Sequence, residues 1–273
     1  SLYSNTNGAA NVAVGEQSLY SNTTGSANIS IGKSGLYNNT TGFNNISLGS
    51  SSMHANSTGS GNVSLGTNAM FSNQNGSYNT VIGHSAANSK SNYTRCTFIG
   101  NEADASVTGL TNATAIGNGA VVNASNKVVI GNSSVTSIGG QVGWTTYSDH
   151  RLKTNITENK LGLSFILDLN TVTYNYTTVG QDNILYTGLI AQEVAEAAQK
   201  SGQNYSGIDR NGDIWGIRYA ELTVPIIKAV QEMAEHNKQL STELNALRAE
   251  LQQLKNELNS NRGMKETQQS VNK

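Results

Sequence analysis

The sequence is poor in the residues that mark several common classes of protein. Its 273 residues include one cysteine, Cys96, and one proline, Pro225. A single cysteine excludes an intrachain disulfide framework and a cysteine-rich zinc site. No apolar run approaches the ~20 residues needed to cross a bilayer, and no stretch has the pattern of a secretory signal, so no membrane span is predicted.

Charged residues are also scarce, at 13%, and the formal net charge is −1. No basic patch stands out, which argues against nucleic acid as a partner. The 147 residues before Ser148 carry only seven charges: Glu16, Lys33, Lys90, Arg95, Glu102, Asp104 and Lys127. The stretch 146-TYSDHRLKTN-155 alone adds Asp149, Arg151 and Lys153. This abrupt change predicts a boundary between two kinds of structure.

A seventeen-residue repeat occupies the first part of the chain, as in 19-LYSNTTGSANISIGKSG-35. Glycine, asparagine and large apolar residues each recur at this spacing: Gly15, Gly32, Gly49, Gly66, Gly83, Gly100 and Gly117; Asn11, Asn28, Asn45, Asn62 and Asn79; Leu2, Leu19, Leu36, Met53 and Met70. A fixed short period is the signature of a repeat architecture. Because the chain opens inside a repeat and without an initiator methionine, we expect it to be the C-terminal part of a longer protein.

Each repeat contains a short alternating strand, such as 28-NISI-31, with Ile29 and Ile31 expected on one face. The glycine after the strand and the Asn-Thr-Thr-Gly turn tolerate positive φ. A strand this short cannot bury its apolar face alone, so the stacked coils of a β-solenoid are predicted to bury it. Since a coil of seventeen residues has a thin core, we also expect lateral burial between chains in a homo-oligomer.

The repeats resemble the head repeats of trimeric autotransporter adhesins, through the unit length and the Asn-x-x-x-Gly pieces such as Asn28 to Gly32. The resemblance covers residues 1–118 and implies a left-handed β-roll with three chains side by side. After Gly117 the next Ile-Gly pair follows at fourteen residues. Residues 119–147 are therefore predicted to end the shaft with irregular β structure.

Two features of the repeats have simple interpretations. The triplet Asn22-Thr23-Thr24 matches the acceptor pattern for N-glycosylation, but such triplets arise by composition in repeats rich in asparagine and threonine. His54 and His84 fall in different registers of the repeat, which excludes a stacked metal ladder. Both histidines are expected at the surface.

A helical period begins at Pro225, with Thr223 just upstream as the expected cap. Residues at a and d positions alternate in steps of four and three: Ile226, Val230, Met233, Asn237, Leu240, Leu244, Leu247, Leu251, Leu254 and Leu258. This seam predicts a coiled coil over residues 225–259, followed by a polar tail at 260–273.

The charges beside this seam indicate how the helices pair. Glu243 and Glu250 fall at g positions, and Arg248 and Lys255 fall at the following e positions. Opposite charges at these positions favour parallel chains in register. The heptads leave the number of strands open, and a trimer is predicted only from the shaft.

Residues 148–224 are predicted to form a small α+β domain, with an apolar element at 163–169, a strand at 171–176 and a helix at 188–198. The turn 209-DRNGD-213 has the acidic pattern of an EF-hand loop. The glutamate that a 12-residue loop requires at position 220 stands instead at Glu221. A hairpin turn is therefore favoured over a calcium site.

Ser148 and Lys153 lie five residues apart, so the amine can reach the hydroxyl if the segment bends back on itself. A serine needs a base to become a nucleophile, and a lysine can act as that base once burial leaves it neutral. Such pairs also occur by chance in most proteins. On its own, this pair indicates no more than a turn serine and a solvated lysine.

The string 148-SDHRLK-153 resembles the Ser-Asp-x-Arg-x-Lys signature of the C-terminal intramolecular chaperone of endosialidases. Further stretches resemble that domain in the same order: 163–176, 188-GLIAQEV-194, 217-IRYAEL-222 and Pro225 leading into the coil. The resemblance covers residues 146–258.

This resemblance implies a role for each matching residue. Ser148 is the expected nucleophile, Lys153 its base, and Tyr147–Ser148 the bond that is cut. Asp149 and Arg151 match the signature without an assigned role beyond orienting the bend, and His150 fills its variable position.

The family consists of domains at the C-termini of viral tail spikes and fibres and of some other trimeric proteins, which gather three chains, help the β shaft to fold and then cut themselves off. The resemblance therefore implies a homotrimeric virion fibre or spike, assembled in the host cytoplasm, that acts once as a self-cleaving serine peptidase without metal or cofactor.

The alternative is a trimeric structural or adhesive fibre segment, at the cell surface, whose chaperone domain does not cut. In either case the shaft, or a region upstream of it, is a candidate for binding a host glycan or protein receptor. A membrane-bound transcription factor and a glycosidase are not supported, because no DNA-binding domain and no paired carboxylates of the shaft are found.

Overall fold

The computed structural model describes residues 1–177 and 184–271, so that residues 272–273 of the predicted polar tail lie outside it. The chain forms two compact units. The first consists of Ser1–Thr146 with the short segments Asn175–Leu185 and Arg210–Trp215. The second begins at Tyr147. The division between the units therefore falls at the boundary that the change in charge predicts, beside the Tyr147–Ser148 bond.

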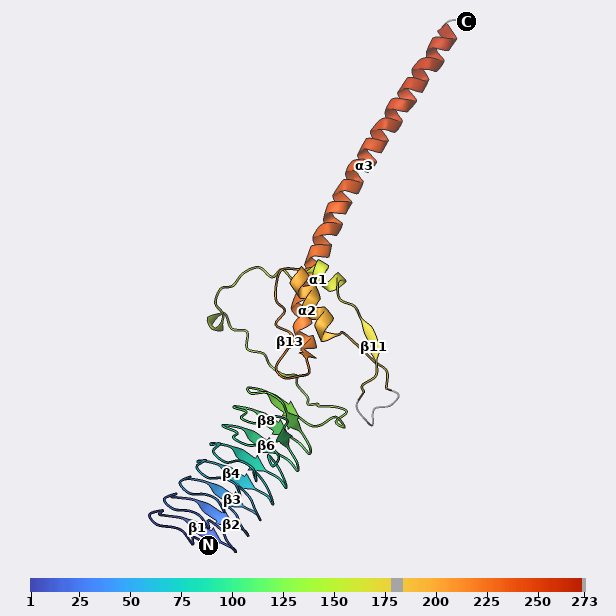
Figure 1. Ribbon diagram of the computed structural model, residues 1–273. Coiled ribbons are helices and arrows are strands. Elements are labelled where there is room, and N and C mark those ends of the chain that lie inside the picture. The colour runs from blue at the N-terminus through green and yellow to red at the C-terminus, as the bar shows by residue number, and fades with distance from the viewer. Residues whose placement is uncertain (178–183, 272–273) are drawn as a thin grey trace. The chain divides into compact units, whose positions relative to one another are not determined.

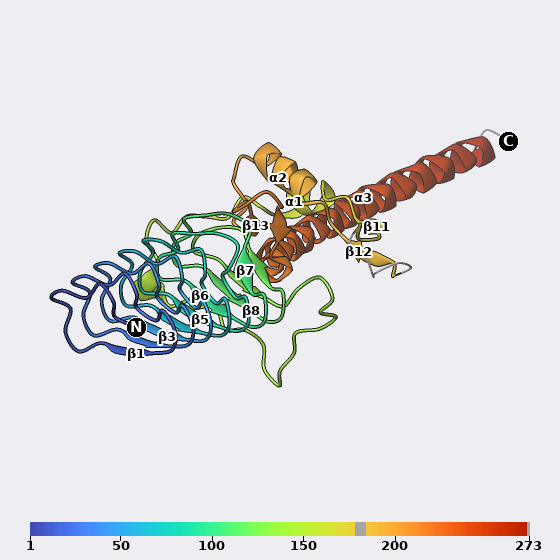
Figure 2. The same cartoon turned by 60° about the horizontal axis from the view of Figure 1, so that its bottom comes forward.

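The first unit is a β-solenoid whose coils stack one upon another (Figures 1 and 2). Strands of successive coils form an eight-stranded parallel sheet: β1 (Val12–Val14), β2 (Ile29–Ile31), β3 (Ile46–Leu48), β4 (Val63–Leu65), β5 (Thr80–Ile82), β6 (Thr97–Ile99), β8 (Thr114–Ile116) and β10 (Val128–Ile130). Ile29 lies opposite Ile46, a shift of one repeat, whereas Thr114 lies opposite Val128. The repeat architecture is confirmed, and the sheet extends beyond the predicted end of the repeats at residue 118. Two shorter strands, β7 (Asp104–Ala105) and β9 (Val121–Val122), pair separately.

The strands face the opposite way from the prediction. In β2 the middle residue, Ser30, is buried, while Ile29 and Ile31 are 36% and 44% exposed. Ser47 and Ser64 are likewise buried at the centres of β3 and β4. The prediction that coil stacking buries Ile29 and Ile31 is therefore wrong. Alternation defines the two faces of a strand, and it does not say which face lies inside.

The interior is filled by the third register of the repeat. Leu19, Leu36, Met53 and Met70 are fully buried, each with φ near +50°. A left-handed backbone costs a residue with a β-carbon about 1–2 kcal/mol. Burying such a side chain returns about 1.5–3 kcal/mol. Burial therefore offsets the strain at these positions.

Buried asparagine side chains form a ladder along the solenoid. The Asn39 amide Nδ2 donates to Asn22 Oδ1 at 2.7 Å and to the Gly42 carbonyl at 3.0 Å, and Asn56 Nδ2 donates to Asn39 Oδ1 at 2.9 Å. Each coil thus satisfies the polar groups of the one before it. Because the Asn22 side chain is buried in this ladder, the folded chain does not present the Asn22-Thr23-Thr24 triplet as a glycosylation acceptor.

A second ladder runs through Asn28, Asn45 and Asn62, in which each Oδ1 accepts from the backbone N–H one repeat further on. Cys96 stands at the next position of this register: it donates its backbone N–H to Asn79 Oδ1 at 2.9 Å, and its Sγ accepts from the Ala113 backbone N–H at 3.4 Å. Burial raises the pKa of the Cys96 thiol. The chain's single cysteine is therefore a core residue that extends the ladder to the next coil.

The repeat glycines serve two different purposes. Gly32, after the strand, has φ +140°, as predicted. The turn glycine, Gly25, does not have positive φ, so for it that prediction is wrong. It is needed for close packing instead, because a β-carbon there would collide with the Gly42 carbonyl oxygen and with Asn22 Oδ1.

Aromatic rings stack along one side of the first coils. Tyr20 and Tyr37 have ring centroids 5.2 Å apart, and His54 lies between Tyr37 and Phe71 at 5.1 and 4.9 Å. Burial lowers the pKa of the His54 imidazole. His54 is therefore a half-buried member of a ring stack rather than a free surface residue, whereas His84 is exposed as expected.

The second unit is a small mixed α and β region followed by a long helix (Figure 1). Its elements are α1 (Leu163–Leu167), β11 (Val172–Tyr174), β12 (Tyr186–Gly188), α2 (Ala191–Lys200), β13 (Ile208–Asp209), β14 (Gly216–Ile217), the 3₁₀ helix η2 (Tyr219–Leu222) and α3 (Thr223–Val271). β11 pairs with β12 and β13 with β14, both antiparallel. The turn after Asp209 is thus part of a hairpin, as the sequence favours, and the helix predicted at 188–198 begins later, at Ala191.

The core of the second unit packs around Phe165 of α1, which is fully buried. The Tyr205 ring lies 5.7 Å from it, centroid to centroid. On α2, which contacts α1, Val194 and Ala198 are buried on one face, one helical turn apart. Helix α1 therefore contributes a fully buried aromatic side chain and contacts both α2 and α3, although it has only five residues.

Helix α3 begins earlier and ends later than predicted. Thr223 has helical angles, φ −55° and ψ −40°, so it is not the expected cap, and Pro225 lies in the first turn. The helix continues past Asn259 to Val271. Its seam side chains are exposed, for example Leu244 at 48% and Leu251 at 53%.

Candidate self-processing site

The Ser-Asp-x-Arg-x-Lys segment forms a single tight turn. Asp149 caps the short 3₁₀ helix η1 (His150–Leu152), because its Oδ1 accepts from the Arg151 backbone N–H at 2.8 Å. The Arg151 guanidinium pairs with the same carboxylate, at 2.8 Å from Oδ2. This ion pair holds the pKa of Asp149 below its usual range. The two signature residues without a predicted chemical role thus build the bend themselves.

The bend brings the serine and the lysine together. The Lys153 backbone N–H closes the turn on the His150 carbonyl at 3.0 Å. Lys153 Nζ then donates to Ser148 Oγ at 2.8 Å. Of the predicted site residues, Ser148, Asp149, Arg151 and Lys153 are therefore all in one hydrogen-bonded turn, whereas the His150 side chain is exposed and makes none of these contacts.

The turn lies open to solvent in the single chain. Ser148 and Lys153 are both exposed. On the upstream side, Tyr147 and Trp144 are each 88% exposed, in a segment without regular structure. The Tyr147–Ser148 bond is therefore accessible, and the amine that would act as base remains in water.

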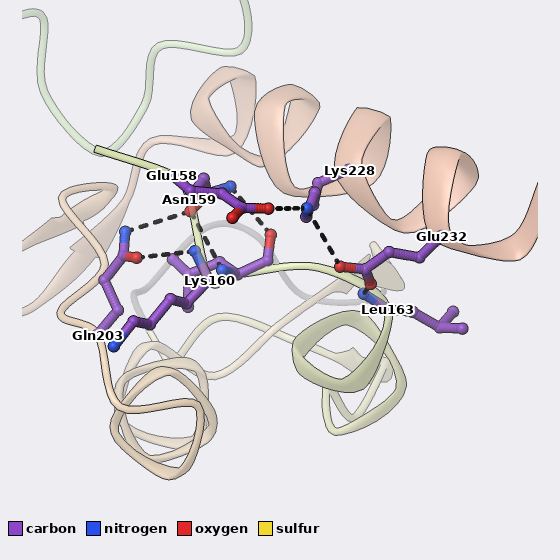
Figure 3. Close-up of polar contacts among 8 residues, drawn as sticks. Glu158, Asn159, Lys160, Leu163, Gln203, Lys228 and Glu232 are labelled. Atoms are coloured by element: carbon purple, nitrogen blue, oxygen red, sulfur yellow. Dashed lines mark hydrogen bonds and ion pairs between the residues drawn. The ribbon is translucent and has the colours of Figure 1, made fainter. Parts of the chain in front are cut away.

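Three side chains that the sequence did not single out hold the segment after this turn (Figure 3). Lys228 Nζ lies 2.6 Å from Glu158 Oε1, and Glu232 accepts from the Leu163 backbone N–H at 2.7 Å. No period or propensity links them, since Glu158 and Lys228 are seventy residues apart.

A stacked solenoid with a separate mixed unit and a long helix is consistent with a repeat-containing fibre or spike protein. Residues 148–203 match the family model of peptidase S74, described as the chaperone of endosialidase. The match begins at Ser148, the first residue of the hydrogen-bonded turn. No curated protein and no solved structure matches the chain. In the described residues, every helix is too short or too polar to cross a bilayer.

Proposed function

We propose that this chain is part of a trimeric tail spike or fibre whose second unit gathers three chains, helps the solenoid to assemble and then cuts the Tyr147–Ser148 bond. The observation that carries the proposal is the 2.8 Å hydrogen bond between Lys153 Nζ and Ser148 Oγ, next to the boundary between the two units. The family match at residues 148–203 supports the chaperone role. The proposed location is the virion, after assembly in the host cytoplasm.

The chemistry uses the serine hydroxyl as an intramolecular nucleophile. Ser148 Oγ forms a bond to the Tyr147 carbonyl carbon while Lys153 Nζ takes the hydroxyl proton. The C–N bond then breaks, and the proton passes to the leaving α-amine of Ser148. Water hydrolyses the resulting ester, which releases the Tyr147 carboxylate and restores the Ser148 hydroxyl. Each chain is cut once.

The base requires a change of environment. An amine must lose its proton before it can accept one, and removal from water favours the neutral form of an amine. Lys153 is exposed in the single chain. We therefore propose that neighbouring chains cover the turn in the trimer, so that assembly precedes cutting.

Exposed apolar surfaces support the trimer. The outward residues of the sheet include Ile29, Ile31 and Ile116, at 36%, 44% and 37% exposure. On α3, Leu244 and Leu251 of the heptad seam are about half exposed. Contiguous apolar surface of this kind is typical of protein–protein contact. We assign the sheet face to lateral packing of the solenoids and the seam to a parallel three-stranded coil.

The proposed reaction is tested by the mass of the folded protein. The wild-type chain should yield two fragments, 1–147 and 148–273, whereas Ser148→Ala and Lys153→Met should each stay intact. Ser137→Ala and Lys160→Met change exposed residues of the same types nearby, and both should cut as the wild type does. An intact wild-type chain after folding would refute self-cleavage. Sedimentation of the Ser148→Ala chain tests the trimer separately, since a monomer would refute it.

A second function is favoured by one observation, the exposure of both Ser148 and Lys153. If the amine stays solvated in the trimer, the second unit trimerises the fibre without cutting it. The protein would then be a structural or adhesive segment, at a virion or cell surface, whose solenoid binds a host glycan or protein. An intact wild-type mass together with a trimeric sedimentation coefficient would identify this function.

A further inference from the structure

Helix α1 has no N-terminal cap of its own. The residue before it, Gly162, carries no side chain and has φ −123° and ψ −138°. The Leu163 backbone N–H instead donates to Glu232 Oε2 at 2.7 Å, from helix α3 (Figure 3). A β-carbon at position 162 would collide with this carboxylate. The absence of a side chain at Gly162 thus makes room for a cap supplied by Glu232, which lies 69 positions after Leu163.

The same helix holds the start of this segment through an ion pair. Lys228, one turn before Glu232, places Nζ 2.6 Å from Glu158 Oε1 and 3.7 Å from Glu232 Oε1. The hydrogen bond to Lys228 holds the pKa of Glu158 below its usual range, and that to Glu158 raises the pKa of Lys228. The same face of α3 therefore contacts both ends of residues 158–163, through a surface ion pair at Glu158, whose side chain is 82% exposed, and through the cap at Leu163.

Gln203 fixes the middle of the segment from the other side (Figure 3). Its Oε1 accepts from the Lys160 backbone N–H at 2.9 Å, and its Nε2 donates to Asn159 Oδ1 at 3.2 Å. By contrast, residues 154–157, which lead back to Lys153, are exposed. Glu158 is therefore the first position after the turn, within the described residues, whose side chain another helix holds.

We infer that Glu232 and Lys228 are positioning residues for cleavage. They hold the segment that follows the Ser148–Lys153 turn against α3, so that the position of the turn depends on this helix. This inference rests on the proposed function. Glu158 lies five positions after Lys153, a reach of at most ~17 Å. If that anchor is lost, the next held position is Asn159, whose Oδ1 accepts from Gln203 Nε2, and the reach grows to ~20 Å. The effective concentration of the turn at its working position then falls by less than about two-fold.

Loss of the Glu232 cap should have a larger effect, since it frees α1 as well as the segment before it. We expect Glu232→Ala to slow first-order cleavage of the full chain about five-fold, a size typical of a lost helix cap. Glu232→Gln keeps an oxygen that can accept from the Leu163 N–H, so it should recover most of the rate. Glu235→Ala, an exposed position on the same helix, should cut at the wild-type rate.

Two further readouts separate positioning from catalysis and from general misfolding. The midpoint of the rate against pH should be the same in Glu232→Ala as in the wild type, with only the plateau lowered, because the titrating base is unchanged. Sedimentation should show the same assembly state for Glu232→Ala as for the wild type.

The outcomes distinguish a failure of the positioning role from a failure of the proposed self-cleavage. A wild-type chain that is cut, with Glu232→Ala cut equally fast, overturns the positioning role and leaves the proposed function standing. A shifted pH midpoint, or no recovery in Glu232→Gln, also overturns it. A wild-type chain that is never cut overturns the proposed cleavage, and the positioning role with it.

Discussion

The asparagine ladder predicts a large and local loss of stability when one member is removed. In Asn39→Ala the Asn22 Oδ1 loses the donor that it has in the ladder. The Gly42 carbonyl still accepts from Asn28 Nδ2, and Asn56 Nδ2 still donates to the Gly59 carbonyl. An orphaned buried acceptor costs about 1–3 kcal/mol, and each ordinary hydrogen bond contributes about 0.5–1.5 kcal/mol. We therefore expect Asn39→Ala to lower the free energy of unfolding by about 2–4 kcal/mol per chain.

The neighbouring Asn38 provides a matched control, because it has the same side chain in the same coil but is exposed. Asn38→Ala should change the free energy of unfolding by less than about 0.5 kcal/mol. With an m-value of about 2 kcal/mol/M in urea, the Asn39→Ala midpoint should fall by about 1–2 M. Far-UV circular dichroism of the Ser148→Ala chain measures both variants on one uncut polypeptide.

The result that refutes this reasoning is a pair of midpoints that agree to within about 0.25 M. The ladder would then be a consequence of stacking rather than a source of stability. A fall of equal size in both variants would instead mean that any alanine disturbs the turn, and burial would not be the cause.

Two other predictions concern the second unit. Burial raises the pKa of Tyr205 to about 12 from 10.0. The neutral phenol therefore contributes stability that is complete below pH 10 and is lost as the pH rises towards 12. Tyr205→Phe should resist alkaline unfolding, followed by circular dichroism, better than the wild type, and identical unfolding curves for the two proteins would contradict this. Leu244→Asp with Leu251→Asp should shift the sedimenting species from trimer to monomer, while Ala246→Asp with Ala249→Asp, off the seam, should not.

The sequence predicted those parts of the fold that depend on spacing along the chain. The seventeen-residue period defines the register of the sheet, since Ile29 and Ile46 are one repeat apart and lie opposite each other. The steps of four and three after Pro225 define a helix. In both cases the physical rule acts between residues close in sequence, so the pattern is legible without a structure.

The facing of the strands could not be predicted in this way. Ile29 and Ile31 were expected inside because apolar residues usually avoid water. The interior of the coil is instead occupied by Leu36 and by the asparagine ladders. Which face turns inward depends on how the whole coil closes, including left-handed backbone at buried leucines, and period-two alternation carries no information about that closure.

The candidate site likewise contains local contacts, which the sequence could predict, and long-range contacts, which it could not. The approach of Lys153 to Ser148 follows from a local turn, in which Asp149 caps and Arg151 pairs within four residues. The cap that Glu232 gives to α1 joins positions 69 residues apart, and no propensity or period links them. One local signal was present, since a glycine before a helix leaves its first N–H groups without a side-chain acceptor.

The spacing of the contacts also indicates which step of assembly a chaperone domain would accelerate. Along the solenoid, both asparagine ladders and the strand pairs join residues one repeat apart, so each coil can be added to the last by closing a short loop. Stacking within one chain therefore needs only the closure of loops about one repeat long. The outward apolar residues, such as Ile31, find no partner in their own coil and remain 44% exposed. If the solenoids do pack laterally, the encounter of separate chains is the step that depends on concentration, and α3 is the element placed to raise it.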